Sequence, residues 1–396
     1  MHKKIKKNRI SKLYNVTLST IKAEAGRLLY FFTKNKKEDI WLIYETATQC
    51  QENGYYLFSY IRKFYPEMKV YYVISKDAPE IKKIKKLGNI LYYESFKQIL
   101  YMYKANKIIS THGLWIIPNE LGILKKLTRN TLKAKKIMLN HGVGFLKNGK
   151  KFYHKSTFDL NNLIIALSDH HKNIFTKEYG YNNNDVIITG YPRFDNMIDQ
   201  SEKFNNIITF MPTFRDNEDN IGNSFQLTDL FLTIKKIMLD TRLIKFFEKN
   251  NITFFIYLHQ NIQKYSYMLN EFSSKNIIVA EQGEYNVEYL LKISKCLITD
   301  YSSVLFDFVY MQKPFISYQF DLNKFIASRK EKAFLDFKTD LPGYVVNKHS
   351  ELVEKIILLS KNNFTFIDEH KNKAKVFFKY NDTENSKRVF EVIKNL

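Results

Sequence analysis

The chain has 396 residues and a formal net charge of +22, with 45% hydrophobic and 15% aromatic residues. This length exceeds the usual size of one domain, and the apolar content excludes an intrinsically disordered chain, so we expect two folded domains. Its two cysteines, Cys50 and Cys296, are far apart and form no CxxC pattern. This spacing argues against a disulfide framework or a zinc site and fits a reducing cytoplasm.

The first 37 residues are disproportionately basic. They contain eleven Lys and Arg and one acidic residue, Glu24, a net charge of +10, which leaves +12 for the other 359 residues. Apolar residues recur there at steps of mostly three and four, the pattern of an amphipathic helix: Ile10, Leu13, Tyr14, Leu18, Ile21, Ala25, Leu28 and Phe32. Such a helix favours an anionic membrane surface, and the alternative is packing on the protein body.

No apolar run reaches the roughly 18–20 residues that a membrane-spanning helix needs. The longest run in the basic arm covers only residues 28–32. An apolar core of signal-peptide length and a small-residue cleavage site are also missing from the arm. We therefore expect a cytoplasmic protein that lies peripherally on the inner face of the cell membrane.

Beyond the arm, short apolar runs alternate with helical patterns. The first series has expected strands at 40–44, 70–74, 89–93, 107–110, 136–140 and 163–167, with helices at 55–65 and 95–104. The second has expected strands at 207–211, 253–258, 276–279, 295–298 and 314–316, with helices at 227–240 and 284–293. Such alternation predicts parallel sheets with helices on both faces.

The pattern predicts an α/β protein of two Rossmann-like, doubly wound domains. We expect a basic arm at 1–37, a first domain at 38–198 and a second at 199–396, with the polar residues 199–204 as a hinge. In such sheets ligands bind at the carboxyl ends of the strands, so the cleft between the domains is the expected site.

Two histidines of the first domain each follow an expected strand and precede a glycine. His141-Gly142 ends the run at 136–140, and His112-Gly113 follows the run at 107–110. Histidine titrates in the range suited to a general base, and glycine allows a ligand to approach the backbone closely. A structural turn is the alternative for a lone histidine.

Strand ends of the second domain carry residues suited to a diphosphate. They lead to Thr213 and Arg215, to His259, and to the turn Asp300-Tyr301-Ser302-Ser303. Arg can bind phosphate in a bidentate manner, and a hydroxyl-rich strand-to-helix turn presents free backbone N–H groups. Ser and Asp are also ordinary helix N-caps, and Arg215 could simply pair with Asp216. Together these residues indicate an anionic donor.

Other features are less specific. Gly190-Tyr191-Pro192-Arg193-Phe194-Asp195 lies at the domain junction, where Arg193 could pair with Asp195 or contact a ligand. The acidic residues Asp216, Glu218 and Asp219 are more typical of a solvated turn than of a metal site. No Walker A, GxGxxG or HExxH motif is present. We predict no cofactor and no metal.

Taken in order, these motifs resemble the CDP-glycerol glycerophosphotransferase family of teichoic-acid enzymes, the TagB/TagF type, whose GT-B fold has two Rossmann-like domains facing across a cleft. The resemblance runs from about residue 38 to 345. It rests on residues 40–45, 52–55, 140–142, 190–193, 211–216, 258–259, 298–303, 313–314 and 321–322.

The resemblance implies transfer of a polyol phosphate, most simply glycerol phosphate, from a CDP-activated donor to a hydroxyl of a lipid-linked glycan or polymer, with release of CMP. His141 corresponds to the base that deprotonates the acceptor. Donor-binding positions correspond to Thr213, Arg215, His259, Ser302 and Ser303, and Asp300 would orient their loop. On the acceptor side or in the cleft stand His112, Gly142, Lys147 and Arg193.

Two departures from the family pattern leave the substrates open. After His141-Gly142 the chain continues Val-Gly-Phe-Leu-Lys147, where the family often has Thr-Pro-Leu-Lys, and Gln260 stands where Pro is common. CDP-ribitol is therefore an alternative to CDP-glycerol. The extra N-terminal domain of long polymerases is not present in this sequence, which favours a primase-like or short capsule-type enzyme.

Two rival functions remain. A GT-B glycosyltransferase that uses a nucleotide sugar would share the fold, although the Asp-Tyr-Ser-Ser turn favours a polyol-phosphate donor. A non-enzymatic basic protein that binds membrane or nucleic acid would explain the charge. No nucleic-acid motif is apparent, so nucleic acid is not an expected partner.

Overall fold

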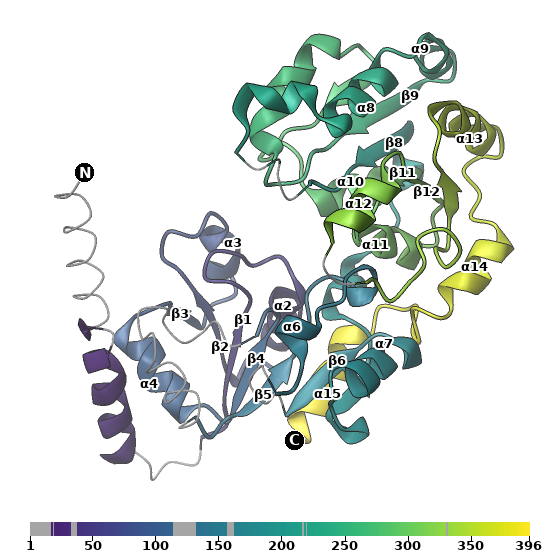
Figure 1. The fold of residues 1–396 in the computed structure, drawn as a ribbon. Helices are drawn as coiled ribbons and strands as arrows, with labels where there is room; N and C mark the ends of the chain where they lie inside the picture. The colour runs from purple at the N-terminus through teal and green to yellow at the C-terminus, as the bar shows by residue number, and fades with distance from the viewer. Residues whose placement is uncertain are drawn as a thin grey trace. The chain divides into compact units, whose positions relative to one another are not determined.

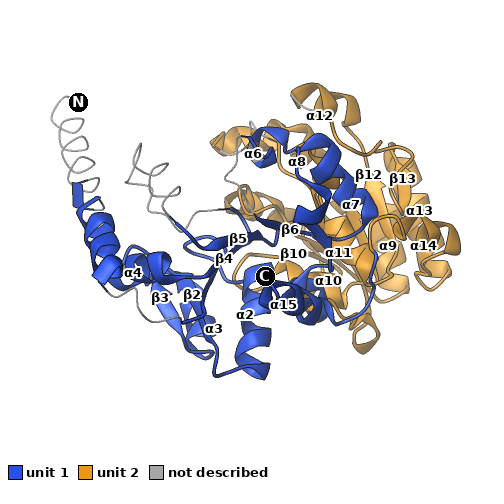
Figure 2. Ribbon diagram, turned by 90° about the horizontal axis from the view of Figure 1, so that it is seen from below, with its two compact units in different colours: residues 1–141, 149–195, 379–396 blue, residues 142–148, 196–378 orange. Residues whose placement is uncertain are grey.

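The computed structural model describes residues 17–18, 20–32, 38–113, 132–156, 162–215, 218, 220–329 and 332–396 (Figure 1). The chain divides into two compact units (Figure 2). Unit 1 comprises residues 1–141, 149–195 and 379–396, and unit 2 comprises residues 142–148 and 196–378. Each unit is built on one parallel sheet.

Unit 1 contains a seven-stranded sheet in the order β3-β2-β1-β4-β5-β6-β7. Its strands are β1 (Ile40–Tyr44), β2 (Lys69–Ile74), β3 (Ile90–Tyr92), β4 (Lys107–Ser110), β5 (Lys135–Met138), β6 (Leu163–Ala166) and β7 (Val186–Ile188). The strand order reverses between β1 and β4, which are paired in register from Trp41–Lys107 to Tyr44–Ser110. In parallel α/β sheets this reversal point is where ligands bind.

Helices cover both faces of this sheet. They are α2 (Asn53–Phe64), α3 (Ile81–Lys85), α4 (Phe96–Lys104), α6 (Lys150–Tyr153), α7 (Asp169–Asn173) and α15 (Asn385–Lys394). All five residues of β1 are buried, as expected for an apolar strand inside a parallel sheet. Ile40 and Leu42 pack in one core with Met102 of α4, whereas the ring of Trp41 lies 5.9 Å from that of Phe390 in α15.

Unit 2 contains a six-stranded sheet in the order β10-β9-β8-β11-β12-β13. Its strands are β8 (Asn206–Met211), β9 (Ile252–Ile256), β10 (Ile277–Val279), β11 (Cys296–Thr299), β12 (Phe315–Tyr318) and β13 (Tyr344–Val346). Its helices are α8 (Asp229–Met238), α9 (Thr241–Lys249), α10 (Val287–Ile293), α11 (Val304–Tyr310), α12 (Leu322–Ser328), α13 (His349–Lys361) and α14 (Asp368–Ala374). The order reverses between β8 and β11, as it does between β1 and β4.

The end of the chain differs from the sequence-based division. Residues 379–396 belong to unit 1 rather than to the second domain, and the main break falls after residue 195 rather than 198. The physical reason is the helix α15. Its Phe390 ring stacks on Tyr65 at 4.2 Å, and the Asp195 carboxylate accepts hydrogen bonds from the backbone N–H groups of Asn385 and Ser386, both at 2.7 Å. The strands β7 and β13 were also absent from the expected series.

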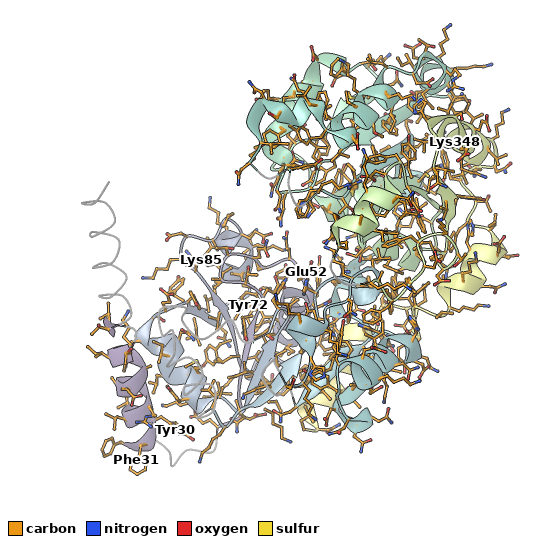
Figure 3. The ribbon with its side chains drawn as sticks, in the orientation of Figure 1. Tyr30, Phe31, Glu52, Tyr72, Lys85 and Lys348 are labelled. Carbon is orange, nitrogen blue, oxygen red and sulfur yellow. The ribbon has the colours of Figure 1, made fainter. Side chains whose placement is uncertain are left out.

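The basic arm forms a helix over residues 20–32 that packs on unit 1 through small residues. Ala23 is buried in the core that includes α4, and a Cβ on Gly26 would lie 3.0 Å from Ile99 of that helix. Figure 3 shows Tyr30 on the side toward α4 and Phe31 pointing away from it. The predicted apolar stripe is largely exposed instead, with Ile21 59%, Leu28 57% and Phe32 80% accessible. Positions 1–16, 19 and 33–37 lie outside the described residues.

Candidate active site

The two histidines singled out in the first half of the chain are brought together in unit 1. The rings of His112 and His141 are stacked, with centroids 4.3 Å apart and planes at 21°. Each follows the carboxyl end of its strand, β4 or β5, and these strands are neighbours in the sheet. His141 is exposed and His112 is half-buried. Burial, followed by the nearby His141, lowers the pKa of His112 to about 3, so this ring is neutral at physiological pH.

A left-handed turn directs His141 out of the sheet. Asn140 has φ 64° and is buried. Its side-chain amide donates to the carbonyl of Ile165 at 2.8 Å, and its own carbonyl accepts from the side chain of Asn53 at 2.7 Å. Asn tolerates this backbone conformation better than most residues, which explains its place before the histidine.

Tyr153 is a neighbour of His141 that the sequence analysis missed. Its hydroxyl lies 3.4 Å from His141 Nδ1. Burial raises the pKa of Tyr153 to about 12, so the phenol keeps its proton and remains a neutral hydrogen-bonding group. Tyr153 lies at the end of the short helix α6, after strand β5, and nothing in its local sequence distinguishes it from the other 26 tyrosines of the chain.

The N-terminus of α2, which could otherwise accept a phosphate, is filled by the protein itself. Glu45 is fully buried, and its carboxylate accepts backbone hydrogen bonds from Gln51, Glu52 and Tyr55, each at 2.8 Å. Burial and the Glu52 charge raise the pKa of Glu45 to about 8, against the lowering effect of these hydrogen bonds. The end of this helix is therefore closed to a substrate anion.

Arg193 of unit 1 is connected to the turn that carries His141. Its backbone N–H donates to the side-chain oxygen of Asn53 at 3.1 Å, and its guanidinium Nε lies 3.8 Å from Glu52. Asp195 caps α15 and is not the ion-pair partner of Arg193. Asn53, which is fully buried, thus links Arg193 to the turn that carries His141.

In unit 2, Asp300 joins the ends of β8 and β11. One of its carboxylate oxygens accepts from the backbone of Thr213 at 2.8 Å and of Tyr301 at 2.6 Å. The other lies 3.0 Å from the guanidinium of Arg215. Asp300 is fully buried, so it holds the turn in place and has no access to substrate of its own.

Arg215 is held by carboxylates rather than standing open to solvent. Its guanidinium forms a bidentate pair with Asp321 at 2.9 and 2.8 Å, a bond to Asp300, and a contact with the carbonyl of Thr213. Its side chain is 13% exposed. Burial alone would lower the pKa of Arg215, but the charges of Asp300 and Asp321 and their hydrogen bonds raise it overall. Asp216, the neighbour considered as a partner from the sequence, lies outside the described residues. Glu218, the described member of the acidic cluster, is buried and accepts from the backbone of Arg215 at 2.9 Å.

Further polar groups lie at the strand ends of unit 2. The hydroxyl of Thr213 is buried and has no hydrogen-bond partner among the described residues. Ser302 and Ser303 are half-buried at the start of α11. His259 stacks on Phe214 at 4.5 Å, and its Nδ1 accepts from the backbone of Asn261 at 3.3 Å. In the neutral ring this bond leaves Nε2 as an N–H donor.

The short segment after His141 belongs to unit 2. Phe145 packs against Phe306 of α11 with ring centroids 5.2 Å apart. Gly142 has φ 40°, and a Cβ added there would lie 3.5 Å from Ser303 Oγ. Lys147, at the end of the segment, is exposed.

The side chains of His, Cys, Asp and Glu form no group of three or more that could hold a metal ion within the described parts of the chain. In the same residues no helix is long and apolar enough to cross a membrane.

Comparison with known proteins identifies the family. The family model of the CDP-glycerol:poly(glycerophosphate) glycerophosphotransferases matches residues 27–395. The chain belongs to this family.

The relatives of this glycerophosphotransferase-family chain are proteins of teichoic acid synthesis. The minor teichoic acid biosynthesis protein GgaB of Bacillus subtilis is 28% identical over 389 residues, which cover 95% of this chain and 42% of GgaB. A teichoic acid poly(ribitol-phosphate) polymerase of Bacillus spizizenii is 26% identical, over 77% of this chain and 46% of the polymerase. The chain thus spans less than half the length of these two relatives.

A solved structure of the wall teichoic acid polymerase TagF superposes with a TM-score of 0.71 and 18% sequence identity, covering 98% of this chain and 97% of the TagF chain. This likeness confirms the expected fold class, a GT-B-like protein with two parallel-sheet α/β domains. The family-based prediction made from the motifs is also confirmed.

Proposed function

We propose that this protein transfers a polyol phosphate from a CDP-activated donor, CDP-glycerol in the first place, to a hydroxyl of a teichoic-acid or capsule-type polymer, and releases CMP. The observation that carries the proposal is the set of polar groups at the reversal point of the unit 2 sheet. A buried hydroxyl without a partner, two serine hydroxyls and an imidazole N–H lie at the ends of β8, β9 and β11. Hydroxyls and N–H groups of this kind bind phosphate oxygens.

In this proposal the donor diphosphate is bound by Thr213, His259, Ser302 and Ser303. Arg215 and Asp300 position these residues, since the guanidinium has already engaged two carboxylates. Because the single positive charge of Arg215 is balanced by the carboxylates of Asp300 and Asp321, its effect is to fix the turn rather than to attract the donor.

His141 acts as the general base on the acceptor. Its imidazole takes the proton of the acceptor hydroxyl, and the oxygen attacks the phosphorus that bears the polyol. The bond from this phosphorus to the bridging oxygen breaks, and CMP leaves with the electron pair. Tyr153 holds the ring of His141 through Nδ1, while the neutral His112 packs on its face. Gly142, Lys147 and Arg193 remain candidates for contacts with the acceptor.

The acceptor is proposed to be lipid-linked, and the protein to lie on the inner face of the cell membrane. The arm helix supports this. Its described apolar residues Leu18, Ile21, Leu28, Phe31 and Phe32 are between 38% and 80% exposed, and residues 1–37 carry a net charge of +10. Apolar side chains next to basic ones favour an anionic lipid surface.

CDP-ribitol is the second candidate donor, because one of the similar proteins is a poly(ribitol-phosphate) polymerase. The two donors differ only in the length of the polyol, and both would release CMP.

The first test is CMP release by the purified protein with CDP-glycerol, CDP-ribitol and a panel of UDP-sugars, each offered with cell-wall lipid or polymer acceptors. CMP formed from one CDP-polyol would support the proposal and name the donor. Release of UDP alone would contradict it and indicate a glycosyltransferase. If no donor reacts, calorimetry with each donor decides between an unsuitable acceptor and a protein that binds no nucleotide at all.

A further inference from the structure

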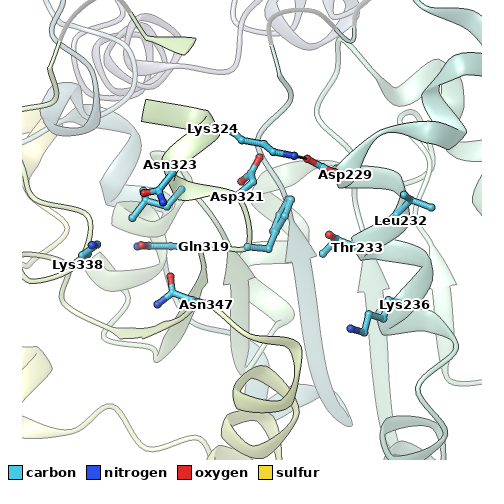
Figure 4. A pocket seen from close by; sticks show the side chains of 12 residues that line it. Asp229, Leu232, Thr233, Lys236, Gln319, Asp321, Asn323, Lys324, Lys338 and Asn347 are labelled. Carbon is cyan, nitrogen blue, oxygen red and sulfur yellow. Dashed lines mark hydrogen bonds and ion pairs between the residues drawn. The ribbon is translucent and has the colours of Figure 1, made fainter. Parts of the chain in front are cut away.

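Two hollows on unit 2 share Leu232 and Lys236 of α8 as lining residues. The first, of about 650 Å³, lies at the carboxyl ends of β12 and β13, between α8 and α12 (Figure 4). The second, of about 940 Å³, is lined by residues from α8, α9 and the start of α13. We call the pair the lysine trough. The proposed transfer reaction uses none of its residues except Asp321, which holds Arg215.

Positive charge predominates along the lysine trough. Its basic lining residues are Lys235, Lys236, Arg242, Lys324, Lys338 and Lys348, against the acidic Asp229, Asp240 and Asp321. Each acidic residue already has a basic partner. Asp229 pairs with Lys324, as the dashed line in Figure 4 shows, Asp240 pairs with Arg242 and His349, and Asp321 pairs with Arg215.

Three lysines of the trough have no such partner. Lys236, Lys338 and Lys348 form no ion pair with any residue that the structure describes, and all three are exposed. Lys236 and Lys338 line the first hollow, and Lys236 and Lys348 line the second. Three exposed ammonium groups that line two adjoining hollows suit a ligand with repeated negative charges.

The trough also offers groups for hydroxyls. Gln319 is 2% exposed, and its amide nitrogen donates to Ser317 Oγ at 3.1 Å and to the carbonyl of Phe337 at 2.6 Å. Gln319 is one of the residues that line the first hollow, and its buried amide oxygen has no hydrogen-bond partner among the described residues. A buried acceptor without a donor is costly, and a ligand hydroxyl would remove that cost. Asn323 and Asn347 add two more amides around the same hollow (Figure 4).

We propose that the lysine trough binds a segment of a polyol-phosphate chain, the polymer that the proposed reaction would extend. This inference rests on the proposed function. The phosphodiesters lie against Lys236, Lys338 and Lys348, and the polyol hydroxyls donate to Gln319 and its neighbouring amides. Single-stranded nucleic acid suits the trough less well. It would require open aromatic faces for stacking, but Phe320, the aromatic ring of the first hollow, packs against the guanidinium of Arg215 at 5.2 Å.

The test compares two triple variants of the full chain with equal charge changes. Lys236→Glu/Lys338→Glu/Lys348→Glu alters the trough. The control, Lys245→Glu/Lys275→Glu/Lys361→Glu, alters three exposed lysines of the same unit that line neither hollow. A soluble, end-labelled poly(glycerol phosphate) chain is titrated by fluorescence anisotropy without any donor. Thermal unfolding shows that both variants are folded.

The trough variant should bind the chain at least tenfold more weakly than the control variant. The slope of log affinity against log salt concentration should become shallower by about two, because each of the three lost phosphate contacts contributes about 0.7 to it. Gln319→Leu, which changes no charge, should also weaken binding of the polyol-phosphate chain but not of inorganic polyphosphate.

Equal affinity of the two triple variants would overturn the proposal. So would absence of chain binding by the unaltered protein, or equally tight, trough-dependent binding of a DNA oligonucleotide or of phosphatidylglycerol vesicles. These results are separate from a failure of the proposed function, which would show as the absence of CMP release from every CDP-polyol. If the proposed function and the role of the lysine trough both hold, CMP release should increase with acceptor length in the control variant but not in the trough variant.

Discussion

The ring of His112 is stacked on that of His141, and the two residues follow neighbouring strands of one sheet. Since burial lowers the pKa of His112 to about 3, His112 adds no positive charge beside His141 at neutral pH. In the proposed reaction this relationship makes His141 the base and His112 its support.

Replacement of His141 by Ala should therefore reduce CMP release by about 10²- to 10⁴-fold, the usual contribution of a general base. Binding of the CDP-polyol, measured by calorimetry, should stay within about twofold, because the groups proposed to bind the donor belong to unit 2. A mutant that lost donor affinity instead would contradict the assignment of His141 to the acceptor.

Arg215→Lys should weaken donor binding about tenfold and lower the free energy of unfolding by about 3 kcal/mol, because one ammonium cannot satisfy both Asp300 and Asp321. The matched control is Arg242→Lys. Arg242 also pairs with an aspartate, Asp240, but its side chain is 55% exposed, so its replacement should lower stability much less than that of Arg215. Urea unfolding measures the stability of the two variants, and calorimetry measures their binding of the donor. Equal effects of the two substitutions would show that Arg215 has no special positioning role.

Gly190→Ala should destabilise the protein by more than about 2 kcal/mol. Gly190 has φ 80°, and a Cβ there would lie 1.8 Å from the side-chain oxygen of Asn385, the first residue of α15. The control Gly88→Ala has nearly the same φ, 74°, with no atom within 4 Å, so it should cost only about 1–2 kcal/mol of backbone strain. Thermal unfolding of both variants measures the difference. Similar losses would mean that α15 moves freely to admit the methyl group.

Stability should decrease as the pH falls below about 6.5, because buried histidines are neutral in the folded protein. Burial and the neighbouring His170 lower the pKa of His171 to about 3, and its Nδ1 accepts from the backbone of Leu167 at 3.3 Å. Between these pKa values the unfolded chain binds the additional proton. The contribution of His171 is thus complete above about pH 6.5 and is lost by up to about 1.4 kcal/mol per pH unit below it.

Urea unfolding between about pH 7 and pH 5 measures this slope. His171→Asn should be less stable at neutral pH and should show a smaller decrease on acidification. An unchanged slope in the variant would mean that His171 is not the group responsible.

Leu28→Glu/Phe32→Glu in the arm should reduce binding to phosphatidylglycerol vesicles at least tenfold, because two exposed apolar side chains are replaced by charges that anionic lipid repels. The control is Ile326→Glu/Leu358→Glu, at residues that are 51% and 45% exposed on unit 2. Co-sedimentation measures the bound fraction. Equal binding by both variants would remove the membrane role of the arm helix.

The sequence predicted much of the fold because parallel α/β sheets leave strong local signals. The run at 40–44 and the run at 107–110 coincide with β1 and β4, since strands buried on both faces are continuously apolar. The strands β7 and β13 were missed, whereas the equally short β3 and β10 were predicted at 89–93 and 276–279. The capping of α15 depends on Asp195, which is 190 residues away from Asn385 along the chain.

The candidate site was predicted in its residue types but not in their partners. His141, Thr213 and Ser302 stand where strand ends place them. The partners of Arg215 were not predictable, because Asp300 and Asp321 lie 85 and 106 residues further along the chain. Tyr153 was missed although it is only 12 residues from His141, because no local motif marks it among the tyrosines of the chain.

The sequence by itself determined the order of strands and helices, the family, and the polar residues at the strand ends, because these depend on local periodicity and on short motifs. Only the tertiary structure decided which charged residues pair with one another and which stay exposed without an ion-pair partner among the described residues. Ion pairs, stacked rings and buried orphan groups such as the oxygen of Gln319 arise between segments far apart in the chain, and their energies depend on distance and burial, which no local pattern encodes.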